Sequence, residues 1–145
     1  MLLPEEIKRY SRHLMLPEIG LEGQERLKGA RVLLVGAGGL GCPVLQYLTA
    51  AGVGTIGIVD DDVVDESNLQ RQILYWVEDI GRGKATVAAE KLARQNTLVN
   101  FHTYTERLTA ENAKELVAAY DLVIDGSDNF PTRYLVNDTC VALNK

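Results

Sequence analysis

The chain has 145 residues, of which 46% are hydrophobic and 24% are charged, a composition typical of a globular protein with a buried core. Its formal net charge of −5 argues against DNA or RNA as a partner, because nucleic-acid binding needs a basic face. The two cysteines, Cys42 and Cys140, are too few for a disulfide framework, and no secretory leader precedes Glu5, so we expect a cytoplasmic protein.

The first 29 residues are predicted to be a helical segment. Pro4 and the two acidic residues after it are typical of a first helical turn, because proline is tolerated where the backbone N–H has no partner and acidic side chains favour that end. This first helix carries Arg12. A second short helix is predicted over residues 23–28, before Gly29 releases the chain into a sheet.

From residue 30 to residue 145 the chain alternates between short hydrophobic runs and amphipathic stretches. The predicted strands are 32–35, 55–59, 99–105 and 121–125. The predicted helices are 40–51, 84–97, 109–119 with Thr109 as N-cap, and 131–143 opened by Pro131. Because strands alternate with helices, we expect an α/β, Rossmann-like, mostly parallel sheet with flanking helices, preceded by short N-terminal helices, in a single nucleotide-binding domain over residues 1–145.

The stretch from Val32 to Val59 contains no charged residue and resembles a membrane span by hydropathy alone. Its many glycines and Pro43 divide it into strand, turn, helix, turn and strand. Parallel strands covered on both faces are apolar throughout. We therefore expect no association with a membrane.

A glycine turn joins the first predicted strand to the next helix. Gly36, Gly38 and Gly41 form the pattern G-x-G-x-x-G, which allows a tight turn, close approach of the backbone to a phosphate, and close packing of helix on strand. The helix N-terminus offers free N–H groups to an anion. Asp60 ends the second strand, where a carboxylate accepts hydrogen bonds from ribose hydroxyls. Together these features predict a nucleotide site; glycines that only pack the helix are the alternative.

Residues beyond the turn favour phosphate chemistry over hydride transfer. Asn68 and Arg71 stand three residues apart in DESNLQRQ and would face one side of a helical turn. Lys84 begins a predicted helix, where a positive charge is unfavourable unless an anion lies near. For each residue alone, a solvated surface charge is the alternative. A hydride-transferring enzyme would need a proton donor for its substrate. His102 lies in the middle of a predicted strand, which indicates a structural residue and not a proton donor.

The segment DGSDN follows the fourth predicted strand, so Asp125 and Asp128 stand at the sheet edge where open α/β sheets bind ligands. One carboxylate there can hold Mg²⁺, which prefers carboxylate and phosphate oxygens. The alternative for Asp128 and Asn129 is capping of the helix that follows, and Asp125 can simply tie the turn.

Taken together, these segments resemble the MoeB/ThiF family of adenylyltransferases. The segments are RYSRH (9–13), GAGGLGCPV (36–44), VDDD (59–62), SNLQRQ (67–72), GRGK (81–84) and DGSDN (125–129). The resemblance implies ATP-dependent adenylylation of the C-terminal glycine of a ubiquitin-like sulfur carrier protein, with pyrophosphate as leaving group. Molybdopterin and thiamine biosynthesis are both open as the pathway.

The resemblance also implies roles for individual residues. Gly39 and its neighbouring glycines would approach the nucleotide, Asp60 would hold the ribose, and Asp128 would be the Mg²⁺ ligand. Three side chains would contact the phosphates, namely Asn68, Arg71 and Lys84. Arg12 matches a family arginine that reaches into the partner subunit's site, so the resemblance implies a homodimer. Arginine suits this role because its planar fork binds phosphate oxygens in pairs.

Family members continue past the position that matches Lys145, with a half that carries the groove for the carrier and a structural zinc site. We therefore expect this chain to lack that groove, to bind zinc nowhere within 1–145, and to self-associate through an exposed sheet edge. Two other functions are kept open. The glycine pattern and Asp60 alone also fit an NAD-dependent oxidoreductase fragment, and the fold without the second half also fits a noncatalytic interaction module.

Overall fold

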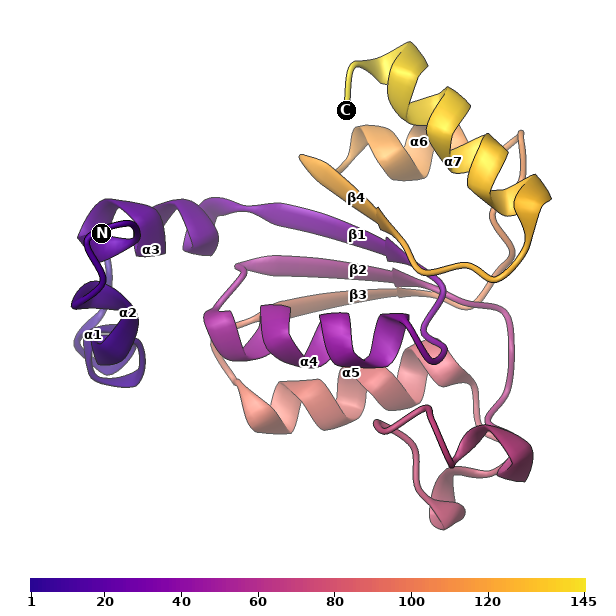
Figure 1. Cartoon of the computed structure of the whole chain (residues 1–145), viewed down its shortest axis with the longest axis horizontal. Helices are drawn as coiled ribbons and strands as arrows, with labels where there is room; N and C mark the ends of the chain where they lie inside the picture. Colours follow the sequence, from indigo (N-terminus) through magenta and orange to yellow (C-terminus); the bar gives the residue numbers. More distant parts are fainter.

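Four parallel strands form the centre of the molecule in this computed structural model, which describes all 145 residues. The strands are β1 (Arg31–Val35), β2 (Thr55–Val59), β3 (Asn100–Tyr104) and β4 (Leu122–Asp125). Their order is β3-β2-β1-β4, so β1 pairs in parallel with both β2 and β4 (Figure 1). The predicted strands and the Rossmann-like α/β class are confirmed, with strand ends that differ by at most one residue.

Helices cover both faces of the sheet because the central strands are apolar on both sides. The helices α4 (Gly41–Ala51) and α5 (Lys84–Gln95) lie on one face, and α6 (Ala113–Ala118) and α7 (Phe130–Leu143) lie on the other (Figure 1). Alternate residues of β1 follow this division. Val32 and Leu34 belong to the apolar cluster under α4 and α5, whereas Leu33 and Val35 belong to the cluster under α6 and α7.

Three helices precede the sheet. They are α1 (Pro4–Arg9), α2 (Ser11–Leu14) and α3 (Gly20–Gly29). The prediction of two helices was wrong, because Tyr10 ends α1 and the chain turns there. Tyr10 is buried, and its hydroxyl accepts a 2.8 Å hydrogen bond from Asn96 Nδ2 at the end of α5. This contact with a residue distant in the sequence fixes the break.

The start of α6 also differs from the prediction. The helix begins at Ala113, and the side chain of Thr109 does not cap it. Instead, the Oδ1 atom of Asn112 accepts a 2.8 Å hydrogen bond from the Thr109 amide, and its amide group donates to the Arg107 carbonyl at 2.9 Å. Asparagine side chains compete in this way with the backbone bonds of a helix, so residues 110–112 form turns.

The connection from β2 to α5 leaves the carboxyl end of the sheet and contains two short 3₁₀ helices. These are η1 (Glu66–Asn68) and η2 (Val77–Asp79). Asp79 anchors the connection, because its buried carboxylate forms an ion pair with Lys91 and accepts a 2.8 Å hydrogen bond from the Trp76 amide.

None of the helices is long and apolar enough to span a bilayer.

Candidate functional site

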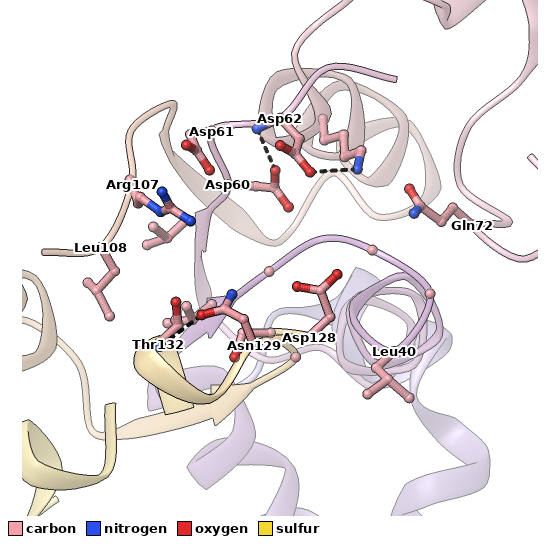
Figure 2. Close-up of a pocket in the computed structure, with 18 of the residues that line it drawn as sticks. Leu40, Asp60, Asp61, Asp62, Gln72, Arg107, Leu108, Asp128, Asn129 and Thr132 are labelled. Atoms are coloured by element: carbon pink, nitrogen blue, oxygen red, sulfur yellow. Dashed lines mark hydrogen bonds and ion pairs between the residues drawn. The ribbon is translucent and has the colours of Figure 1, made fainter. Parts of the chain in front are cut away.

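A pocket of about 560 Å³ lies at the carboxyl ends of the strands, where β4 returns to the other side of β1 (Figure 2). This is the switch point at which open α/β sheets bind ligands, and the volume falls within the roughly 300–1,000 Å³ of small-molecule sites. Most of the predicted site residues line it. They are Gly36, Gly38, Gly39, Asp60, Arg71, Lys84 and Asp128.

The glycine turn has almost no space for side chains. Gly36 has a φ of 92°, and a Cβ atom built on it would lie 2.9 Å from the carbonyl carbon and oxygen of Gly126. A Cβ atom on Gly41, the first residue of α4, would lie 2.0 Å from the Gly36 carbonyl oxygen. Gly41 does not line the pocket. It therefore brings the helix close to the strand, while Gly38 and Gly39 form the pocket wall.

Asp60 lies directly after β2 and is bound to the glycine turn. Its Oδ2 atom accepts a 2.7 Å hydrogen bond from the Ala37 amide, and its Oδ1 atom accepts a 2.8 Å bond from the Asp62 amide. Burial raises the pKa of Asp60, although these two bonds and the charge of Lys84 oppose the shift. Each carboxylate oxygen keeps an acceptor site, so the group can also accept hydrogen bonds from two hydroxyls of a ligand.

Lys84 begins α5 and is only 5% exposed, so it is not a solvated surface charge. Its Nζ atom lies 3.1 Å from Asp62 Oδ2, a carboxylate whose side chain is 68% exposed (Figure 2). The ammonium group is thus held at the pocket wall, beside the N-terminus of a helix. The ammonium group and the positive end of the helix dipole at one wall together favour an anionic ligand.

Arg71 lies beside the glycine turn. A Cβ atom on Gly39 would lie 3.5 Å from Arg71 Cγ, and Arg71 Nη1 donates a 3.2 Å hydrogen bond to the Ser67 carbonyl. Asn68 lies in the same turn, since its carbonyl accepts a 3.1 Å bond from the Arg71 amide. The side chain of Asn68 does not line the pocket. Of this predicted pair, the structure brings only Arg71 to the site.

Three polar residues at the end of β4 and just after it, Asp125, Asp128 and Asn129, have different contacts. Asp125 Oδ1 accepts bonds from the amide and hydroxyl of Ser127, at 2.9 and 2.6 Å, so it ties the turn. Asn129 caps α7, with its Oδ1 atom 3.0 Å from the Thr132 amide. Asp128 makes no side-chain hydrogen bond or ion pair and lies at the pocket beside the glycine turn (Figure 2). Its free carboxylate is a suitable oxygen ligand for Mg²⁺.

Gln72 and Arg107 are among the pocket residues that were not predicted from the sequence. Gln72 is 4% exposed, and its buried Oε1 atom has no hydrogen-bond partner. Arg107 follows β3 and lines the opposite wall from Gln72 (Figure 2). A basic residue just after a predicted parallel strand was a usable signal for Arg107. No sequence signal distinguished Gln72 from its neighbours.

Arg12 lies on α2 and does not line the pocket. In Figure 1 the helices α1 to α3 lie at the amino ends of the strands, opposite the end that carries the glycine turn. Arg12 therefore takes no part in the site of its own chain.

A parallel sheet with a glycine turn after β1, a carboxylate after β2 and cationic groups at the carboxyl edge defines a Rossmann-like α/β protein. The sequence matches the ThiF family over residues 10–145, and the chain therefore belongs to that family. This confirms the resemblance drawn from the separate motifs.

Curated relatives cover the chain almost completely. It is 60% identical to a sulfur carrier protein adenylyltransferase of Thermus thermophilus over 141 residues, which are 97% of this chain and 52% of the relative. It is 58% identical to MoeZ of Mycobacterium tuberculosis, a probable adenylyltransferase/sulfurtransferase, over 97% of this chain and 36% of the relative. The chain thus spans about half, or less, of these relatives.

Solved structures give the same fold. The tRNA N6-threonylcarbamoyladenosine dehydratase TcdA of E. coli, in complex with ATP, superposes with a TM-score of 0.93 over 99% of this chain and 59% of that chain, at 24% identity. MccB of E. coli with AMPCPP and MccA superposes with a TM-score of 0.82 over 99% of this chain and 45% of that chain, at 28% identity.

Proposed function

We propose that residues 1–145 are the nucleotide-binding part of an ATP-dependent adenylyltransferase that acts on a ubiquitin-like sulfur carrier protein. The convergence of Arg71, Lys84 and Asp128 on one pocket supports this proposal most strongly. These residues come from three separate segments and meet beside a glycine turn and the Asp60 carboxylate. Two cations and a free carboxylate suit a triphosphate with its metal, not a nicotinamide.

In the proposed reaction, the C-terminal carboxylate of the carrier attacks the α-phosphorus of ATP, and pyrophosphate leaves with the electrons of the broken phosphoanhydride bond. The products are an acyl-adenylate and pyrophosphate. A carboxylate approaching a phosphate meets charge repulsion, so the chain must supply positive charge at the leaving group. Lys84 and Arg71 would stabilise that charge, and Asp60 would orient the nucleotide through the ribose. Asp128 would hold Mg²⁺, which neutralises phosphate charge when bound.

The proposed carrier ends in Gly-Gly, as the resemblance to the MoeB/ThiF family implies. The relatives named for sulfur carrier adenylylation and MoeZ support this class of partner. Molybdopterin and thiamine biosynthesis are the pathways proposed for it. Exchange of labelled pyrophosphate into ATP, dependent on a Gly-Gly-ending carrier, tests the reaction; no exchange by the full-length protein would contradict it.

ATP with Mg²⁺ is expected to raise the melting temperature of this chain more than NAD does. A ligand that binds the folded state at 100 times its Kd stabilises it by about 2.7 kcal/mol, which corresponds to several degrees for a domain of this size. Differential scanning fluorimetry with ATP, NAD and no nucleotide makes the comparison. Stabilisation by NAD alone would instead favour the oxidoreductase alternative.

We also propose that Arg12 acts in a homodimer. Because Arg12 lies away from its own pocket, it can reach a triphosphate only in a second copy. Arg12→Ala and Lys84→Met are each expected to lose tight ATP binding. Mixing the two variants should restore about a quarter of the tight sites, since half of the dimers would be mixed and one site in each would be intact. Titration calorimetry counts these sites; no recovery in proven mixed dimers would contradict the proposal.

A further inference from the structure

Tyr75 is a buried residue that does not line the pocket but contacts the glycine turn. Its side chain is 3% exposed, and its hydroxyl donates a 2.6 Å hydrogen bond to the carbonyl oxygen of Ala37, which lies between Gly36 and Gly38. Burial is the main cause that raises the pKa of Tyr75 well above its ordinary value. The hydroxyl therefore stays protonated and remains a donor.

With the bond from Tyr75, both backbone polar groups of Ala37 in the glycine turn have a side-chain partner. The Ala37 amide donates to Asp60 at 2.7 Å, and the Ala37 carbonyl accepts from Tyr75. The only other donor to this carbonyl is the Cys42 thiol at 3.5 Å, and thiols are weak donors. Ala37 is fully buried, so its carbonyl is shielded from bulk water. Gly38 follows it directly and lines the pocket.

The same hydroxyl oxygen lies where two other binding segments meet the turn. The carbonyl oxygen of Lys84 is 3.4 Å from it, at the first residue of α5. Tyr75 itself lies four residues after Arg71, and its amide donates a 3.1 Å bond to the Gln72 carbonyl. One buried hydroxyl thus connects the glycine turn with the segments that carry Arg71 and Lys84.

We infer that Tyr75 is a positioning residue for phosphate binding, one that holds the glycine turn, the Arg71 segment and the start of α5 in register. The inference rests on the proposed function, because it assumes that these three segments bind the phosphates of ATP. Tyr75 does not line the pocket itself. In the proposed function these three segments bind the phosphates, whereas Asp60, which would hold the ribose, keeps its own hydrogen bond from the Asp62 amide. Loss of the Tyr75 hydroxyl should therefore weaken the phosphate contacts more than the contacts of the nucleoside.

The test is Tyr75→Phe in the complete chain, which removes one hydroxyl and keeps the ring. ATP affinity with Mg²⁺ is expected to fall roughly 5- to 20-fold, because a buried carbonyl loses its partner and the turn relaxes. Adenosine affinity, measured by displacement calorimetry, is expected to stay within about twofold, since adenosine has no phosphate to lose contact with. A purely structural role would lower both affinities equally or neither.

Tyr104→Phe is the matched control. The Tyr104 hydroxyl is 2.9 Å from the Tyr120 hydroxyl and lies outside the pocket, so its loss should leave the ATP-to-adenosine affinity ratio unchanged. An unchanged ratio in Tyr75→Phe as well would overturn the inference alone. Failure of the unmodified chain to bind ATP would overturn the proposed function, and the inference with it.

Hydrogen exchange of the unmodified chain keeps the inference testable if Tyr75→Phe does not fold. On ATP binding, peptides that contain residues 36–41, 71–76 and 84–87 should gain protection together, because one hydroxyl connects them. Protection confined to 36–41 would contradict a shared positioning contact.

Discussion

Lys84→Met is expected to weaken binding of ATP with Mg²⁺ by roughly 100-fold or more, which equals about 2.7 kcal/mol. The ammonium group is almost fully buried at the pocket wall, where low solvent access strengthens its attraction to a phosphate. Methionine has a similar length and no charge. Isothermal titration calorimetry measures the change in affinity.

The same substitution should leave the melting temperature unchanged or slightly higher. The partner of Lys84 is Asp62, whose side chain is 68% exposed, so the carboxylate that loses its partner stays hydrated. Lys91→Met gives the opposite pattern and serves as control. Its partner Asp79 is 2% exposed, so the melting temperature should fall while ATP affinity stays the same. A Lys84→Met protein that binds ATP normally would exclude this lysine from phosphate binding.

Asp128→Asn is expected to abolish most of the effect of Mg²⁺ on ATP binding, about 10- to 100-fold in affinity. Asparagine keeps the shape of the side chain but removes the charge that attracts the metal. Without Mg²⁺ the variant should bind ATP as well as or better than the unmodified chain, because one negative charge no longer repels the phosphates. Titrations with ATP in Mg²⁺ and in EDTA provide both values.

Asp138→Asn, an exposed substitution on α7, is the control that should leave the Mg²⁺ effect intact. A full Mg²⁺ effect in Asp128→Asn would instead point to Asp60, Asp61 and Asp62, whose carboxylate oxygens lie within 4.8 Å of one another. Lys84 forms an ion pair with Asp62, whereas the Asp128 carboxylate has no such partner, so Asp128 is the freer of the two candidate metal sites.

The two central strands, β1 and β2, were predictable because burial leaves a local signature. Residues 32–35 and 56–59 are buried throughout, as their unbroken apolar runs indicate. The start of the first helix at Pro4 was predicted correctly, but the break between α1 and α2 and the start of α6 were not predictable. They depend on the contact of Tyr10 with Asn96 and on the competing bonds of Asn112, neither of which appears in a hydrophobic pattern.

The sequence by itself determined the succession of strands and helices along the chain, the glycine turn and the carboxylate at Asp60, because backbone conformation and burial pattern are encoded within a few residues. Only the tertiary structure decided which polar side chains meet. It buried Lys84 against Asp62, brought Arg71 to the pocket without the side chain of Asn68, and placed the Tyr75 hydroxyl on Ala37. These contacts join residues far apart in sequence, so they depend on the path of the connections and the packing of the helices, which no short segment specifies.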